Sequence, residues 1–431
     1  MITPTNLNSL LEVVRDFARD CVEHTDLTKA EDDIQKIIRM AGNAMMCEAA
    51  AKISGKSTYK GVRIVCECGG EARFKEYRER YIKTLHGDVK ISRAYYCCEH
   101  CGQTYMPWDQ EQGMNERIWT PRVKELVASM CAALTYEAAS SLIKRTCGLA
   151  IEESSEEDIV RDVSKRLRQE EQDEIIAVVD TGEGIPVSET PGRLYIGIDA
   201  AKAHTDGEWH DIKTAVVYEG ILPEGKDVDT VINPRYIAAQ ETSEDFGRRI
   251  CAKAVHCGYE RAAEQVVIGD GAEWIWNEAR NHFPKATKII DYWHACEHIY
   301  NLAQELYEEG DHKGKRWAED HCRKLKEKGP NGLIRAMRRR KARNEKDQEA
   351  LRLELGYFTK YRKYMDYPTY RAKGMMIGSG PVESACKIIV GQRLKQAGMR
   401  WTRDGADSVL AVRTSLLSGE LGRIERAARA A

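Results

Sequence analysis

Apolar side chains recur at spacings that divide the chain into helical and strand-like parts. Residues 1–60 are expected to be helical, because apolar residues there repeat every three to four positions. In residues 61–110 the pattern changes to two strands, 77–85 and 89–96, separated by His86-Gly87-Asp88. This part of the chain is therefore expected to form a β-hairpin.

Three short helices are expected in residues 111–172. Pro121 is typical of a first helical turn, and Cys147-Gly148 is typical of a helix end. Such a set of helices fits either a helix-turn-helix DNA-binding unit or an ordinary helical linker, and the pattern favours neither. The apolar face of the third helix is formed by Ile159, Val163 and Leu167.

From residue 173 to 291 the spacing becomes that of strands. Three strands followed by a βαβ-like tail indicate an α/β fold, a mixed sheet with helices packed on it. A charged, helix-like insertion is expected over 292–374, and 375–431 returns to the sheet domain with a helix that starts at Pro381. The expected strands are 175–180, 194–198, 212–218, 265–270 and 288–291.

Composition adds two constraints. The 431 residues carry a net charge of −2, yet residues 313–343 hold 13 Lys and Arg against three Asp and Glu. That local excess fits a face that contacts phosphates or a solvated helix surface. The N-terminus does not resemble a signal peptide and no apolar run is long enough to span a membrane, so a cytoplasmic protein without a membrane partner is expected.

Acidic residues follow two of the apolar strands. Asp180 and Asp270 each end such a strand, and active groups in an open sheet gather outside the carboxyl ends of strands. Glu383, in the first turn of the helix after Gly378-Ser379-Gly380-Pro381, can supply a third carboxylate. Three such groups could hold two magnesium or manganese ions about 3.5–4 Å apart for an in-line displacement. Taken alone, each acid is more often a turn or helix cap. Asp199 also ends an expected strand, and Asp291 is an alternative third ligand.

Four cysteines flank the expected hairpin. Cys66 and Cys68 precede it, and Cys98 and Cys101 follow it. Four thiolates from two turns bind one zinc ion tetrahedrally and can stabilise a hairpin too small to fold alone. The first pair is one residue closer than the usual spacing, so free cysteines are the alternative, and Cys97 or His100 could replace one of the ligands.

Two runs near the C-terminus, GSGPVESACK at 378–387 and RLKQAGMRW at 393–401, resemble the ISKra-type insertion-sequence transposases. The segments VVIGDG at 266–271, DYWH at 291–294 and CEHCG at 98–102 are similar to the same family. The resemblance extends from about residue 62 to the end of the chain. It implies an RNase H-like catalytic fold that acts on double-stranded DNA, at transposon terminal repeats and at target sites, in a prokaryotic cytoplasm or nucleoid.

The resemblance also implies an Asp-Asp-Glu triad, which falls on Asp180, Asp270 and Glu383. Asp291 and His294 match an Asp-x-x-His element that supports the active site. The first acid departs from the family's Asp-Gly-Thr-Gly context, since Thr181-Gly182-Glu183 follows Asp180. Cutting two transposon ends calls for at least two protomers, so a homodimer or larger assembly on DNA is expected. Contacts with DNA are expected from Arg338, Arg339, Arg340, Lys341, Arg393, Lys395, Arg400 and Trp401.

Two other functions stay open at this point. A transposase-derived protein that binds DNA without cutting it would keep the cysteines, the helices and the basic face. A zinc metalloprotease would use His294-x-x-Glu297-His298, which places two histidines beside a general base on one helical face. The protease hypothesis leaves the three acids and the cysteine pairs unexplained.

Overall fold

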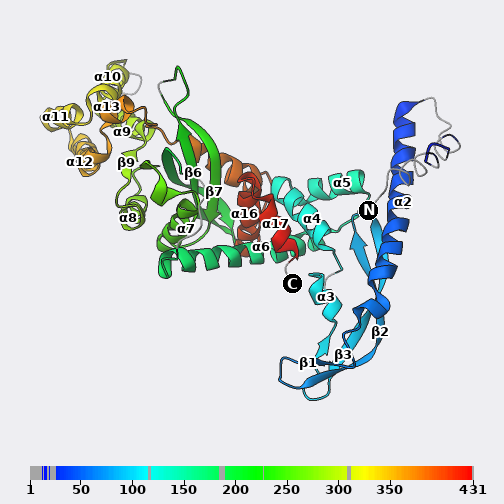
Figure 1. Cartoon of the computed structure of the whole chain (residues 1–431). Coiled ribbons are helices and arrows are strands. Elements are labelled where there is room, and N and C mark those ends of the chain that lie inside the picture. Colours follow the sequence, from blue (N-terminus) through cyan, green and yellow to red (C-terminus); the bar gives the residue numbers. More distant parts are fainter. Residues whose placement is uncertain are drawn as a thin grey trace. The chain divides into compact units, whose positions relative to one another are not determined.

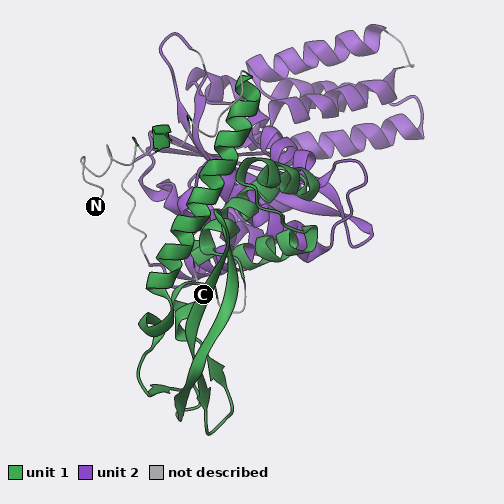
Figure 2. Ribbon diagram, turned by 90° about the vertical axis from the view of Figure 1, so that its right-hand side faces the viewer, with its two compact units in different colours: residues 1–163, 425–431 green, residues 164–424 purple. Residues whose placement is uncertain are grey.

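The computed structural model of this chain describes residues 12, 14–16, 19, 26–114, 118–183, 190–226, 228–307 and 312–429. They form two compact units, coloured separately in Figure 2. The first comprises residues 1–163 and 425–431, and the second comprises residues 164–424. A four-stranded sheet and a five-stranded sheet were found among the described residues, the former in the first unit and the latter in the second.

The first unit contains a long β-hairpin. Its elements are α2 (Leu27–Ile53), η1 (Gly55–Thr58), β1 (Arg63–Val65), β2 (Glu71–Thr84), β3 (Gly87–Cys98), β4 (Thr104–Tyr105) and α3 (Pro107–Glu111). Strands β2 and β3 pair antiparallel across a turn in which Gly87 has a φ of 109°, a conformation that favours glycine. The predicted hairpin is confirmed, and β1 and β4 extend it to a sheet in the order β1-β2-β3-β4.

Three helices follow in the chain, as predicted. They are α4 (Pro121–Ala133), α5 (Tyr136–Cys147) and α6 (Glu153–Ile175). Helix α5 begins after Thr135, whose hydroxyl accepts from the Ala138 N–H, and it ends at Gly148 with a φ of 70°. The predicted apolar face of α6 is buried, as expected for a core position. Their use as a helix-turn-helix unit stays a prediction.

One buried carboxyl group on α6 gives a pH prediction. Glu156 is fully buried, and burial followed by the charge of Glu153 raises its pKa from 4.5 to about 7. The folded state favours the neutral carboxyl of Glu156. This residue therefore does not destabilise the fold below about pH 4.5, and its destabilising effect grows as the pH rises to about 7. Glu156→Gln should therefore stabilise the protein at about pH 8, by up to about 3 kcal/mol, and have little effect at about pH 4. Urea unfolding at both pH values measures the difference. The exposed Glu157→Gln is the control, and an equal gain at both pH values would contradict the prediction.

Segment 175–180 differs from its prediction. A buried strand ending in Asp180 was expected, but α6 continues into a π-helical turn, η2 (Ile176–Asp180). A short apolar run fits a buried strand and a helix equally well by periodicity, and no glycine or proline ends the helix before it. Ile176 is 42% exposed and η2 has no buried residue, so the strand prediction is wrong.

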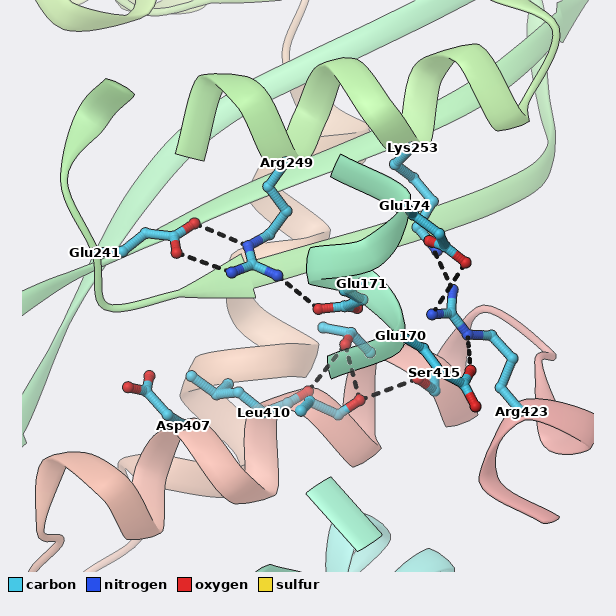
Figure 3. Close-up of polar contacts among 12 residues, drawn as sticks. Glu170, Glu171, Glu174, Glu241, Arg249, Lys253, Asp407, Leu410, Ser415 and Arg423 are labelled. Carbon is cyan, nitrogen blue, oxygen red and sulfur yellow. Dashed lines mark hydrogen bonds and ion pairs between the residues drawn. The ribbon is translucent and has the colours of Figure 1, made fainter. Parts of the chain in front are cut away.

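Ion pairs hold this end of α6 within the second unit (Figure 3). Arg249, on α7 (Ser243–His256), lies 2.6 Å from Glu171 and 2.8 Å from Glu241. Arg423, on α17 (Leu421–Arg429), lies 3.3 Å from Glu174. Residues three apart on a helix share a face, and here Glu171 and Glu174 pair with arginines of α7 and α17 just before η2 begins.

The five-stranded sheet of the second unit has the order β7-β6-β5-β8-β9. Its strands are β5 (Arg193–Thr205), β6 (Glu208–Ile221), β7 (Thr230–Ala239), β8 (Glu264–Gly269) and β9 (Thr287–Ile290). The first three in sequence are antiparallel neighbours, whereas β8 and β9 run parallel to β5. The α/β class with a mixed sheet is confirmed. Strand β7 was not predicted.

Helices fill the rest of the second unit (Figure 1). After η3 (Tyr259–Arg261) and α8 (Glu273–His282), the described part of 292–374 is helical, as expected: α9 (Tyr292–Leu306), α10 (His312–Lys328), α11 (Asn331–Arg339), α12 (Glu345–Lys360), η4 (Arg362–Tyr364) and α13 (Tyr367–Ala372). The chain then forms α14 (Gly380–Ala385), η5 (Cys386–Gly391), α15 (Gln392–Leu394) and α16 (Arg403–Leu417). Among the described helices, none has both the length and the apolar character needed to cross a bilayer.

Candidate functional site

Two aspartates lie on neighbouring parallel strands. In the β5–β8 pair Ile198 is opposite Gly269, so Asp199 and Asp270 follow at the same level of the sheet. Adjacent strands are separated by about 4.8 Å, which lets one ligand reach groups on both. The expected strand end at Ile198 is wrong, because β5 continues to Thr205 through its pairing with β6. Asp270 follows directly after β8, as predicted.

A third carboxylate joins this pair. The pKa of Asp199 is raised, first because burial removes its carboxylate from water and then because Asp270 and Glu383 place negative charge nearby. The Ala200 N–H donates to the Asp199 Oδ1 at 2.7 Å, and the Sγ of Cys386 lies 3.6 Å from its Oδ2. Like charges so placed repel one another unless a cation lies among them. Asp199, Asp270 and Glu383 thus form a cluster of three carboxylates near the middle of the sheet.

Asp270 is held by its own loop. Its Oδ1 accepts from the Ala272 N–H at 2.7 Å, and its backbone carbonyl accepts from the Trp276 indole at 2.8 Å. Tyr357 of α12 packs on the next residue, Gly271, where a Cβ would lie 2.4 Å from its ring. Glycine is thus required for this approach, and the loop that carries Asp270 is fixed from both sides.

Glu383 is held through two residues on separate segments. Its Oε1 accepts a hydrogen bond from the Ser379 hydroxyl at 3.1 Å. The same hydroxyl contacts the carboxylate of Asp291, which also accepts from the Ser379 N–H at 2.6 Å. Asp291 is buried and caps α9 by accepting from the N–H groups of Trp293 and His294. Asp291 thus contacts the serine that holds Glu383, while its predicted support of an active site stays a prediction. The sequence analysis did not identify Ser379, which only its Gly-Ser-Gly context marked.

Asp180 does not lie on the sheet. It ends η2, is exposed, and forms an ion pair with the Arg248 guanidinium on α7 at 2.7 Å. The reason for choosing it from the sequence, a position at the end of a buried strand, is absent from the structure. Asp199 has the position in the sheet that was expected of Asp180.

The two histidines of the protease-like motif have other partners. The Nδ1 of His294 lies 3.5 Å from Glu297, one turn along α9. The Nδ1 of His298 lies 2.8 Å from Glu354, and its ring stacks on Tyr357 with 3.8 Å between centroids. The contacts of His298 connect α9 with α12, which is a structural role, whereas that of His294 stays within α9.

The four predicted cysteines converge in the first unit. The Sγ atoms of Cys66 and Cys101 are 3.5 Å apart, those of Cys68 and Cys98 are 3.7 Å apart, and all four lie within 4.8 Å of one another. A hydrogen bond with the Tyr105 hydroxyl lowers the pKa of Cys66 to about 6. Four sulfurs in this arrangement could bind a metal such as zinc. The Sγ of Cys97 is instead directed to the Gly102 carbonyl at 3.8 Å.

The residues expected to contact DNA divide into two groups. Exposed side chains are Arg338, Arg339, Lys341, Lys395 and Arg400, whereas Arg340 is half-buried on the ring of Tyr307. Arg393 is fully buried, with its guanidinium 4.8 Å from the centroid of the half-buried Trp401. Because a buried guanidinium cannot reach a phosphate, the DNA contact predicted for Arg393 is wrong.

Comparison with known proteins places the chain among relatives of unassigned activity. The model of a family described as "Uncharacterised protein family (UPF0236)" matches residues 69–429. A curated relative, the "UPF0236 protein in vanSb 3'region" of Streptococcus gallolyticus, is 22% identical over 352 residues, which cover 79% of this chain and 73% of the relative. The range matched by the family model includes Cys98, Cys101 and all three clustered carboxylates, whereas Cys66 and Cys68 lie before it.

Proposed function

The chain belongs to the uncharacterised protein family UPF0236, and we propose that it is a DNA transposase with an RNase H-like catalytic domain. The observation that carries the proposal is the cluster of Asp199, Asp270 and Glu383 around two parallel strands. The sheet order supports it, since three antiparallel strands followed by two parallel ones suit the fold that the ISKra-type resemblance implies. Asp199 replaces Asp180 as the proposed first acid.

The residues of the cluster suit a site for magnesium or manganese. Carboxylate oxygens are the ligands these ions prefer, and three of them from separate segments leave positions for water and phosphate oxygens. When bound, two such ions would activate the attacking oxygen and stabilise the leaving one. Asp199 lies on β5, Asp270 is held by the loop after β8, and Glu383 approaches from α14, where Ser379 and Asp291 orient it. In this proposal these contacts limit the orientations of the three acids before DNA binds.

The proposed reaction is hydrolysis of a phosphodiester at a transposon end, followed by attack of the freed 3′-hydroxyl on target DNA. Each step exchanges one oxygen on phosphorus for another, so no side chain needs to become covalently attached.

The cysteine site, when it binds zinc, would stabilise the hairpin. We propose that the hairpin helps to hold the terminal repeats as part of a dimer or larger assembly. Incubation of the protein and magnesium with labelled DNA from both flanks of its gene tests the proposal. Binding without cutting would instead favour an inactive DNA-binding protein.

The contact from Ser379 to Glu383 predicts a partial loss of manganese affinity when the serine hydroxyl is removed. Ser379→Ala removes the hydroxyl that links Glu383 to Asp291, and a hydrogen bond of this kind contributes about 1 kcal/mol. Manganese affinity should fall by about fivefold, because Glu383 then adopts more orientations. Calorimetric titration measures the change. Ser384→Ala, an exposed serine on the same helix, is the matched control, and equal affinities in both variants would contradict the positioning role.

A further inference from the structure

A basic groove lies within the second unit, formed by α10, α13, the start of α9 and the connection between β6 and β7. Two hollows of about 480 and 670 Å³ share the lining residues Lys326 and Arg371 and so are continuous. The larger hollow also includes Lys226 and Lys373. Lys326 belongs to the basic stretch 313–343 noted in the sequence, whereas Lys226, Arg371 and Lys373 were not expected to contact DNA.

Five basic residues line the two hollows, and Arg323 alone among them is paired with a carboxylate of the described chain, Asp320. In the described chain, no ion pair within 4.0 Å joins Lys226, Lys326, Arg371 or Lys373 to a carboxylate. Two acidic residues are among those that line the groove, Glu327 in both hollows and Glu319 in the smaller one, against five basic residues. Unpaired cations along a concave surface attract anions, because the surrounding protein focuses their field into the groove.

The walls of the groove are held together by hydrogen bonds that centre on Arg193. Arg193 donates to the carboxylate of Asp229 at 2.5 Å and to the Lys373 carbonyl at 2.9 Å. The Asp229 N–H in turn donates to the Gly374 carbonyl at 3.3 Å. The β6–β7 connection and the end of α13 are thereby fixed to each other, so the cations are arranged before any ligand binds.

One end of the groove lies beside the loop that leads to Glu383. Trp293 lines the smaller hollow and is 62% exposed. Its indole packs on that loop, since a Cβ on Gly378 would lie 3.3 Å from the ring. Next to it, the ammonium of Lys326 lies over the ring of Tyr292, 5.4 Å from the centroid. The groove thus combines an exposed aromatic face with a row of cations.

We propose that this groove binds the sugar–phosphate backbone of an unpaired DNA strand next to the reacting phosphate, with a base stacked on Trp293. The identity of the ligand rests on the proposed function. An aromatic platform beside a basic channel is how single strands are bound without sequence preference, because every base has a face that can stack. The cations extend along two joined hollows, which suits successive phosphates better than one small anion.

Salt dependence of binding provides the test, measured by fluorescence anisotropy with labelled single-stranded DNA in the absence of magnesium. Each lost phosphate contact reduces the slope of log affinity against log salt by about 0.7 for a single strand. Lys226→Ala with Lys373→Ala should therefore reduce the slope by about 1.4, and Lys326→Ala with Arg371→Ala should do the same. The matched control, Arg362→Ala with Lys363→Ala, removes two exposed cations of η4 outside the groove and should leave the slope unchanged.

Trp293 is tested separately, because stacking is not ionic. Trp293→Ala should weaken binding by about tenfold with the slope unchanged, and Trp293→Tyr should restore most of the affinity. An unchanged slope in both groove variants would overturn the proposal, as would competition by free inorganic phosphate at low concentration, which indicates a small-anion site. Groove-dependent binding by a protein that never cuts DNA would refute the transposase function and leave the groove assignment standing.

Discussion

Asp199→Asn is expected to abolish cleavage of labelled transposon-end DNA in the presence of magnesium, with a rate reduction of at least about 10³-fold. The amide keeps the shape of the side chain but removes the negative charge that a divalent cation needs. Asp270→Asn and Glu383→Gln should have effects of similar size, because the three groups act as one unit. Single-turnover assays with product resolved on denaturing gels measure the rates.

Asp180→Asn is the decisive control for that experiment. The variant removes only an ion pair with Arg248, in which the two side chains are 44% and 31% exposed. Pairs of this kind contribute about 0–1 kcal/mol to stability, so cleavage should continue at close to the wild-type rate. Loss of cleavage in Asp180→Asn together with normal cleavage in Asp199→Asn would mean that Asp180 is the first acid.

Removal of metal from the cysteine cluster should have the second largest effect. Four thiolates that converge within 4.8 Å repel one another once deprotonated, and a bound zinc ion offsets this by about 10 kcal/mol or more. Cys98→Ala should therefore release the metal and unfold the hairpin end, with greatly weakened DNA binding. Metal content by mass spectrometry and limited proteolysis of residues 61–110 measure the two effects.

Cys97 offers a matched control in the adjacent position. Its Sγ is directed to the Gly102 carbonyl rather than into the cluster, so Cys97→Ser should retain one metal ion per chain and resist proteolysis. Wild-type protein that contains no metal, and whose hairpin is equally resistant after chelation, would contradict a structural metal site.

The sequence was sufficient where local patterns decide the structure. The alternation of apolar and polar residues predicted the hairpin. Pairing of its two strands then brings together the cysteines that precede the first strand and those that end or follow the second. Strands β8 and β9 were expected as apolar runs, and Pro381 correctly marked the start of the helix that carries Glu383. Each of these features depends on residues that are close in sequence.

The predictions failed where residues far apart in the sequence determine the local structure. The apolar run before Asp180 suits a strand or a helix, and the ion pair at its end comes from Arg248, 68 positions away in the sequence. Strand β5 passes beyond Ile198 because β6 pairs with it as far as Thr205, which places Asp199 inside the sheet. Burial of Arg393 against Trp401 likewise depends on packing that its basic, surface-like sequence context does not indicate.

Titration of manganese into the DNA-free protein, followed by electron paramagnetic resonance, tests the central claim most directly because it reports on the carboxylates without requiring a known DNA site. Wild type and Asp180→Asn should bind manganese equally, whereas Asp199→Asn, Asp270→Asn and Glu383→Gln should each bind at least about tenfold more weakly. Undiminished binding by Asp199→Asn, with weakened binding by Asp180→Asn, would contradict the site proposed for this chain.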